Sequence, residues 1–146
     1  MSEAFRVRVK VRGYELDTQG HLNWAEYLHY AEHARWELLA AAGIGQAKLL
    51  ATGIGPVVLD TSITFKRELR GGDEVDVTCT FSWGGRATYQ IIQDFIRADG
   101  TLAAALTSKA AFLDLAGRHL ISDPAKHIRA LATSPEIIGL QPVNPS

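Results

Sequence analysis

A polar loop that leads into the longest helical pattern of the chain constrains the fold more than any other feature. Neither Gly nor Pro interrupts the sequence from Trp24 to Ala42, and Gly43 and Gly45 follow this run. Asn23 precedes the run and is a favourable N-cap residue. The pattern therefore predicts a helix over residues 24–42, about five turns long, which ends at the glycines.

Apolar residues recur along this helix at steps of three and four residues, which predicts one buried face. These residues are Tyr27, Leu28, Ala31, Ala34, Leu38 and Ala41. The small alanines among them indicate close packing against the rest of the core.

Alternation of apolar and polar residues predicts one strand before the helix and four strands after it. The expected strands cover residues 5–12, 56–69, 74–83, 87–97 and 102–115. Short glycine-containing links between the last three indicate antiparallel neighbours. Short helices are expected over residues 46–52 and after Asp123, which serves as N-cap for a helix to about residue 132. The Pro-rich residues 133–146 are expected to be irregular.

The order of these elements predicts an α+β fold, with a curved antiparallel sheet wrapped around one long central helix. The 146 residues suit a single domain with a core from about residue 4 to residue 132. We expect the strand over 87–97 or the alanine-rich strand over 102–115 at a sheet edge. The open backbone groups of an edge would favour a homodimer or homotetramer.

Composition and charge exclude several classes of function. The net charge of -1 gives no basic surface for nucleic acid, and no apolar run approaches the roughly 18 residues of a membrane span. The single cysteine, Cys79, fits a reducing compartment and lies in an alternating strand, so we expect a core residue and a cytoplasmic protein. His29 and His33 have ligand spacing but no third ligand nearby in sequence, so no metal is expected.

The loop and the helix together carry a recognisable motif. An Asp is followed by a short loop, then by His, an aliphatic residue and Asn, and then by an aromatic-rich helix with an Ala-Arg-Trp turn. Its residues are Asp17, His21, Leu22, Asn23, Tyr27, Ala34, Arg35 and Trp36. The motif resembles hotdog-fold acyl-CoA thioesterases, specifically the 4-hydroxybenzoyl-CoA thioesterase-like group and its long-chain acyl-CoA thioesterase branch. That branch often has a second Asn where this chain has Trp24, and the similarity continues to about residue 123.

The resemblance implies a hotdog fold and an enzyme that hydrolyses an acyl-CoA to the free acid and thiol. Coenzyme A would be part of the substrate, and no other cofactor is expected. Acyl carrier protein remains an alternative carrier, and the site is expected between two subunits.

Thioester hydrolysis needs an attacking group and a donor for the developing oxyanion. The resemblance carries the catalytic carboxylate over to Asp17, as general base or as nucleophile. The backbone amide of Trp24, at the helix N-terminus, is the candidate oxyanion donor. His21 either orients water or Asp17 or satisfies the loop backbone. Asn23 either contacts the thioester or only caps the helix.

Two further residues are candidates for substrate binding. Tyr27 lies on the apolar helix face beside which the acyl chain is expected, although core packing predicts the same position. Arg86 follows Gly84 and Gly85 in a turn where related thioesterases present basic residues to the nucleotide of coenzyme A, and it is otherwise an exposed turn residue.

Two alternative functions remain open from the sequence. One is a non-catalytic hotdog module that binds acyl thioesters. The other is an enoyl-thioester hydratase or dehydratase in which Asp17 and His21 act together, although the chain lacks the Asn-Pro-aliphatic-His pattern of hydratases.

Overall fold

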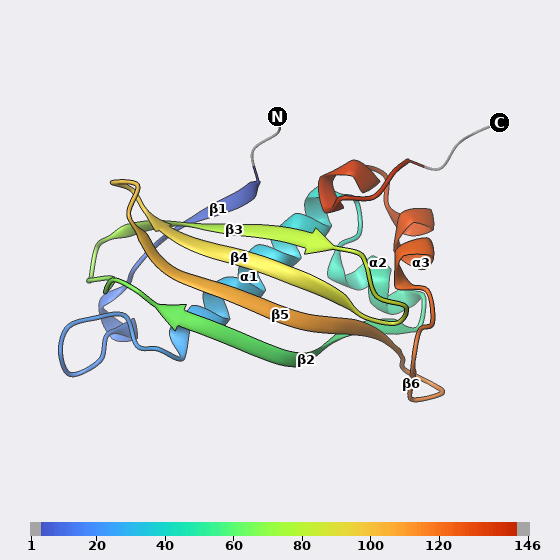
Figure 1. The fold of residues 1–146 in the computed structure, drawn as a ribbon, viewed down its shortest axis with the longest axis horizontal. Coiled ribbons are helices and arrows are strands. Elements are labelled where there is room, and N and C mark those ends of the chain that lie inside the picture. Colours follow the sequence, from blue (N-terminus) through green and yellow to red (C-terminus); the bar gives the residue numbers. More distant parts are fainter. Residues whose placement is uncertain (1–3, 143–146) are drawn as a thin grey trace.

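The computed structural model describes residues 4–142 and consists of one antiparallel sheet with a long helix against one face (Figure 1). The N-terminal half contains β1 (Phe5–Lys10), the 3-10 turn η1 (Gly13–Glu15), α1 (Glu26–Ala41), α2 (Gln46–Ala51) and β2 (Ile54–Phe65). The C-terminal half contains β3 (Glu74–Ser82), β4 (Tyr89–Arg97), β5 (Leu102–Asp114), β6 (His119–Leu120), α3 (Pro124–Leu131) and the 3-10 turn η2 (Pro135–Ile138).

The strands lie in the order β1-β3-β4-β5-β2, and the short strand β6 pairs with β5. All neighbours are antiparallel. The prediction that residues 87–97 or 102–115 form an edge is wrong, because β2 pairs with β5 instead of with β3, its neighbour in sequence. Strands β4 and β5 are therefore interior, and β1 and β2 form the edges. A register shift between Val58 and Asp60 interrupts the ladder of β2.

Helix α1 packs against the inner face of the curved sheet. The Tyr27 ring makes an edge-to-face contact with Phe95 of β4, with 5.2 Å between the centroids. The Gln93 side chain donates a 2.9 Å hydrogen bond to the carbonyl of Ala31. Leu28 is 43% exposed although the sequence pattern placed it on the buried face, whereas Tyr30, outside that pattern, is buried. The wrapped-helix arrangement confirms the predicted hotdog fold.

The N-terminus of α1 differs from the prediction. The helix begins at Glu26 instead of Trp24, and Ala25 occupies the N-cap position without a side-chain capping bond. Asn23 is therefore not the N-cap of α1. Its side-chain oxygen instead accepts a 3.0 Å hydrogen bond from the Ala25 amide, and its carbonyl accepts one of 2.9 Å from the Glu26 amide. These bonds form a separate turn ahead of the helix.

The C-terminal segment contributes to the core beyond the predicted limit at residue 132. Asp123 caps α3 as predicted, with its carboxylate accepting from the Lys126 amide at 3.3 Å. Ile138 of η2 is buried, and its carbonyl accepts a 2.7 Å hydrogen bond from the Trp83 indole. The expected irregular tail over 133–146 is thus partly wrong, since residues 135–138 are ordered and packed; residues 143–146 lie outside the described part of the chain.

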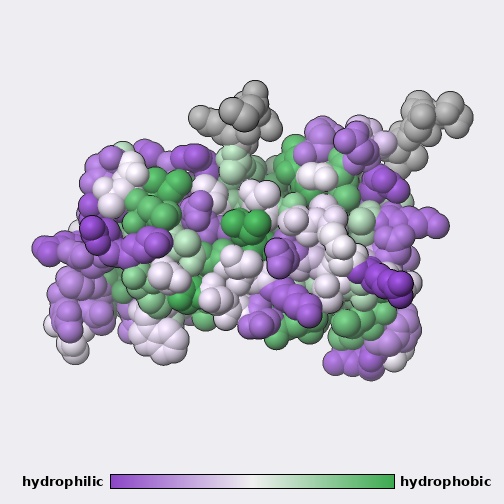
Figure 2. Space-filling view, viewed as in Figure 1, coloured by the Kyte–Doolittle hydropathy of each residue, from purple (hydrophilic) through white to green (hydrophobic). Residues whose placement is uncertain are grey.

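The outer face of the sheet mixes hydrophobic and hydrophilic side chains (Figure 2). Ile92 of β4 is 41% exposed there, between outward-facing Gln90 and Asp94. Among the helices described between residues 4 and 142, none is long and apolar enough to cross a membrane.

Candidate active site

The loop before α1 holds Asp17 in a fixed orientation. One carboxylate oxygen, Oδ1, accepts from the Gln19 amide at 2.8 Å and from the His21 amide at 3.1 Å. The Asp17 amide donates to the His21 carbonyl at 2.7 Å, and Gly20 takes a left-handed conformation that closes the turn. The two backbone N–H groups, from His21 and Gln19, lower the pKa of Asp17, so this exposed carboxylate is ionised at neutral pH. Within residues 4–142 its second oxygen, Oδ2, has no hydrogen-bond partner.

This loop is tied to the link between β2 and β3. The Leu22 amide donates to the Leu69 carbonyl at 2.6 Å, and His21 forms an isolated bridge with Arg70. A cleft of about 320 Å³ opens between the loop, the start of α1 and this link. It is lined by Asp17, His21, Leu22, Trp24, Tyr27, Phe65, Lys66, Arg67 and Glu68. The cleft therefore brings four of the six predicted site residues together.

The turn before α1 leaves one backbone donor without an acceptor within the described residues, on a residue that lines this cleft. The Ala25 amide is occupied by Asn23, whereas the Trp24 amide has no acceptor among the residues that the structure describes. The Trp24 side chain is 68% exposed. An unpartnered N–H beside an ionised carboxylate is a combination that can hold a carbonyl oxygen while its carbon is attacked.

His21 and Asn23 act on this loop through the hydrogen bonds that the structure defines. His21 contributes its backbone to the Asp17 turn, and within the described part of the chain its imidazole makes no hydrogen bond to the Asp17 carboxylate. Asn23 belongs to the site region without lining the cleft, because its side chain is engaged by Ala25. Both residues therefore shape the position of Asp17 and of the Trp24 amide.

Tyr27 forms the apolar floor of the cleft. It is buried, and its ring makes a second edge-to-face contact, with Phe65 at a centroid distance of 5.0 Å. Burial raises the pKa of the Tyr27 hydroxyl to about 12, so the phenol stays protonated. Tyr27 thus meets the expectations of both a core residue and a wall of the site.

Arg86 is not part of this cleft. It lies in the turn after β3, whereas the Asp17 loop is tied to the link that precedes β3, so the nine-residue strand separates them by about 30 Å. Figure 1 shows the two loops at opposite ends of the sheet. Within one chain Arg86 therefore does not reach the Asp17 cleft, and its predicted contact with the nucleotide of coenzyme A stays a prediction.

Four further residues complete the cleft and were not predicted as site residues: Phe65, Lys66, Arg67 and Glu68. Residues 66–69 were predicted to continue a strand, but β2 ends at Phe65. The amides of Lys66 and Arg67 both donate to the Ala103 carbonyl, at 2.8 and 3.0 Å, which turns the chain toward the site. The charged run from Lys66 to Arg70 was the available signal that the strand ends there.

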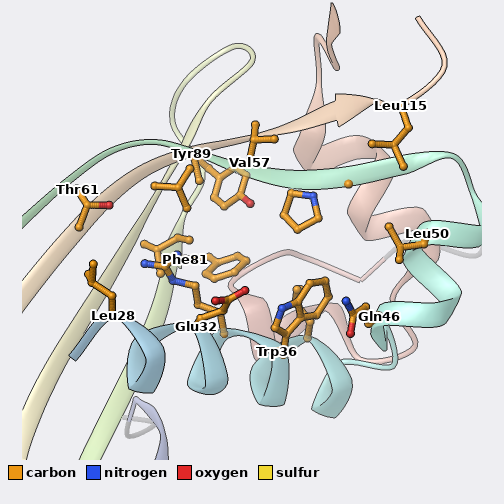
Figure 3. Close-up of a pocket in the computed structure, with 17 residues that line it drawn as sticks. Leu28, Glu32, Trp36, Gln46, Leu50, Val57, Thr61, Phe81, Tyr89 and Leu115 are labelled. Atoms are coloured by element: carbon orange, nitrogen blue, oxygen red, sulfur yellow. The ribbon is translucent and has the colours of Figure 1, made fainter. Parts of the chain in front are cut away.

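A second and larger pocket, of about 540 Å³, lies between α1, α2 and β2 (Figure 3). Leu28, Trp36, Phe81 and Tyr89 supply apolar and aromatic surface, and Arg35 is among its lining residues. Arg35 belongs to the family motif in the sequence, but no function was predicted for it.

The candidate metal and thiol residues take no part in the cleft. His29 pairs with Glu26, with 3.0 Å between Nδ1 and Oε2, and residues 4–142 contain no group of three or more ligands placed to hold a metal. Cys79 lies in the core as predicted, and burial raises the pKa of its thiol to about 12. At neutral pH this thiol is therefore not a nucleophile.

Comparison with known proteins adds sequence and structural relatives. The profile described as "Thioesterase-like superfamily" matches residues 11–138. The chloroplastic acyl-acyl carrier protein thioesterase ATL3 of Arabidopsis thaliana is 37% identical over 82 residues, which are 56% of this chain and 43% of that protein. The long-chain acyl-CoA thioesterase FadM of Escherichia coli is 36% identical over 73 residues, 50% of this chain and 54% of FadM. The chain thus spans about half the length of these curated relatives.

Solved structures match over more of the chain. A hypothetical protein from Aquifex aeolicus has a TM-score of 0.79 at 25% identity, covering 87% of this chain and 98% of that one. YbaW, a probable thioesterase from Escherichia coli, has a TM-score of 0.74 at 25% identity, covering 81% and 89%.

Proposed function

Because this chain belongs to the thioesterase-like superfamily, we propose that it hydrolyses acyl thioesters to the free acid and the thiol. The observation that carries the proposal is the pairing of two groups in one cleft. The ionised Asp17 carboxylate has one oxygen free, and the Trp24 amide beside it is unpartnered among the described residues. The substrate classes in the names of ATL3 and FadM support a thioester substrate.

In the proposed reaction the thioester carbonyl oxygen accepts a hydrogen bond from the Trp24 amide. That bond strengthens as the carbonyl carbon becomes tetrahedral and its oxygen gains negative charge. The free oxygen of Asp17 either removes a proton from the attacking water or attacks the carbon itself. Collapse breaks the carbon–sulfur bond and releases the thiolate, which takes up a proton. In the nucleophilic route, water then hydrolyses the acyl–Asp17 anhydride.

Either route requires the carboxylate form, which the lowered pKa of Asp17 maintains. Because the bonds from His21 and Gln19 engage Oδ1, they leave Oδ2 as the reacting atom. The proposed reaction uses no metal or redox cofactor, and coenzyme A or a carrier protein enters as part of the substrate. The hydratase alternative receives less support, because within residues 4–142 the His21 imidazole makes no hydrogen bond to the Asp17 carboxylate.

A homodimer would explain the exposed side chains of the β2 edge. Val58 and Leu59 are 51% and 48% exposed there, an apolar surface that a second copy would cover. Antiparallel pairing of two β2 strands would set the Phe65 end of one against the Ile54 end of the other. Since Arg86 lies at the Ile54 end of its own sheet, Arg86 of the partner subunit would come to the same end of the dimer as Asp17. Light scattering should then give twice the chain mass of 15.9 kDa; a monomer at working concentration would refute the dimer.

The test is thiol release from short, medium, long and aromatic acyl-CoAs. Asp17→Asn should lower turnover by a factor of about a hundred or more, because the amide can neither attack nor accept the proton. Asp99→Asn is the matched control. Asp99 also accepts a backbone N–H in an exposed turn, from Thr101 at 2.9 Å, but it does not line the cleft. Full activity of Asp17→Asn would rule out this carboxylate, and binding without hydrolysis by the wild type would favour the non-catalytic module.

The two roles of Asp17 can differ in where oxygen from water is incorporated. Turnover in oxygen-18 water labels the Asp17 carboxylate only if that residue is the nucleophile and water opens the anhydride at the Asp17 carbonyl. Opening at the acyl carbonyl puts the label into the released acid, as general-base catalysis does. Label in the peptide containing Asp17, detected by mass spectrometry after many turnovers, would therefore demonstrate the nucleophilic role.

A further inference from the structure

The large pocket between α1, α2 and β2 lies next to the Asp17 cleft along both α1 and β2. Leu28 lines the pocket directly after Tyr27 lines the cleft, and Thr61 of β2 lines the pocket four residues before Phe65. Its volume of about 540 Å³ and its aromatic walls suit an acyl group. The inference below rests on the proposed thioester substrate and concerns what this pocket selects.

Arg35 places a partly buried cation in the wall of this mostly apolar pocket. Its Nε donates to the Gln93 side-chain oxygen at 2.9 Å, and its Nη2 donates to the Ser108 hydroxyl at 2.9 Å. Ser108 in turn bonds the Thr61 hydroxyl at 2.9 Å, which links the guanidinium to β2. The orientation of Arg35 is therefore fixed by side chains from three strands of the sheet.

The guanidinium keeps unused donors. Two of its five N–H groups are accounted for by Gln93 and Ser108, and no carboxylate within residues 4–142 lies within 4.0 Å of it. Nη1 has no hydrogen-bond partner within the described residues but is not fully buried. It is therefore accessible from the pocket. Burial also lowers the pKa of Arg35, in keeping with poor hydration, although the group stays charged.

Glu32 supplies an acceptor beside these donors. It precedes Arg35 by three residues, which makes the two neighbours on the helix surface, and Figure 3 shows Glu32 extending into the pocket. A pure hydrocarbon chain here would remove water from the Arg35 N–H groups without replacing it, which is unfavourable. A carboxylate would satisfy Arg35 but would lie next to the Glu32 charge. A hydroxyl can accept from Arg35 and donate to Glu32 at once.

We propose that Arg35 and Glu32 form a specificity site that selects acyl groups carrying a hydroxyl on the part farthest from the thioester. The aromatic walls bind the hydrocarbon portion, and the pair binds the hydroxyl. Neither residue takes part in bond cleavage.

The test uses matched CoA thioesters of octanoic, decanoic and dodecanoic acid, each plain, with a terminal hydroxyl, or with a terminal carboxylate. For at least one length the hydroxylated substrate should exceed the plain one in kcat/KM by about tenfold, the size expected for a hydrogen bond to a charged group. Equal values at every length, or preference for the carboxylated series, would overturn the proposal.

Glu32→Ala should bring the ratio of hydroxylated to plain substrate close to one without affecting folding, since Glu32 is exposed and alanine favours helix. Glu37→Ala is the matched control, an exposed glutamate of the same helix that does not line the pocket, and it should keep the wild-type ratio. Arg35→Lys, which keeps the charge but loses the fork, should also lower the ratio. An unchanged ratio in Glu32→Ala and Arg35→Lys would refute the assignment.

Titration calorimetry separates this inference from the proposed hydrolysis. The same thioesters are titrated into the Asp17→Asn protein, in which they stay intact. Tighter binding of the hydroxylated series by about tenfold supports the specificity site even if the wild type hydrolyses nothing. Equal affinities for the plain and hydroxylated series would overturn the site even if the wild type is an active thioesterase.

Discussion

A buried carboxylate just before the Asp17 loop offers a quantitative test of how that loop is held. Glu15 is 6% exposed and accepts three hydrogen bonds: from the Tyr30 hydroxyl at 2.6 Å, from the Arg12 amide at 2.9 Å and from the Arg12 guanidinium at 3.2 Å. Its carbonyl accepts from the Asn23 amide at 2.9 Å. Glu15 thus joins α1 to both ends of the loop that carries Asp17.

Tyr30→Phe removes one of these bonds and leaves the ring in place. Because the acceptor is a charged and buried carboxylate, the loss should lower the free energy of unfolding by about 1.5–3 kcal/mol. For a chain of this size, about 2 kcal/mol corresponds to a fall in Tm of about 4–8 °C. Turnover should fall as well, since the loop loses an anchor two residues from Asp17.

The effect on stability should depend on pH with a definite sign. Burial acts to raise the pKa of Glu15, but the hydrogen bonds from Tyr30 and Arg12 outweigh it, so its pKa lies below the usual 4.5. A carboxyl whose pKa is lower in the folded state stabilises the protein above the unfolded-state pKa and loses that contribution as pH falls through the folded value. The difference in the free energy of unfolding between wild type and Tyr30→Phe should therefore be largest near pH 7 and should decrease below about pH 4.5.

Urea unfolding at several pH values measures this difference. Tyr14→Phe is the matched control, because Tyr14 is 84% exposed one residue from Glu15 and should change stability by less than about 0.5 kcal/mol. A Tyr30→Phe protein as stable as the control, or a difference that grows in acid, would refute the argument.

The remaining predictions concern the pH profile and two glycines. Since the pKa of Asp17 is lowered by backbone N–H groups, kcat/KM should show no acid-side loss between about pH 5 and 7; a loss within that range would contradict Asp17 as the group whose ionisation controls the reaction. Gly72→Ala places a side chain at a φ of +86° with open space around it, and should cost about 1–2 kcal/mol of stability. Gly43→Ala combines a φ of +88° with an overlap between the new Cβ and the Thr133 hydroxyl. It should therefore lower the free energy of unfolding by about 1–3 kcal/mol more than Gly72→Ala does; equal urea midpoints for the two variants would contradict this.

The architecture was accessible from sequence because it depends on local signals. Alternation located all five long strands, and the uninterrupted run before Gly43 located α1. The pairing of β2 with β5 was not accessible, since it joins segments about 50 residues apart and only short hairpins have a local signature. The burial of Ile138 was missed for a related reason, because its partner Trp83 lies 55 residues away in the chain.

The candidate site was accessible where the motif is contiguous. Asp17, His21, Trp24 and Tyr27 meet in one cleft because a single loop and helix start carry them. The residues of β2 and of the link after it lie at the cleft because His21 forms a β-bridge with Arg70. No local sequence pattern predicts that bridge. Arg86 shows the converse limit. It follows β3, at the end of the sheet opposite the Asp17 loop, so only a second subunit could bring an Arg86 to this cleft.

The turn ahead of α1 determines which backbone amide is left for the reaction. An Asn that caps a helix accepts from the second or third amide after it, and the Asn23 side chain does the same here although α1 begins two residues later than predicted. Asn23 engages the amides of Ala25 and Glu26, so of the three amides between Asn23 and Tyr27 only that of Trp24 has no acceptor among the described residues. Removal of one such donor from an enzyme typically lowers turnover by a factor of about 10²–10³. We therefore expect Asn23 to affect turnover by holding this turn, in which the Trp24 amide has no acceptor among the described residues. Asn23→Asp, which preserves the acceptor, should retain more activity than Asn23→Ala; equal activity of the two variants would contradict this role.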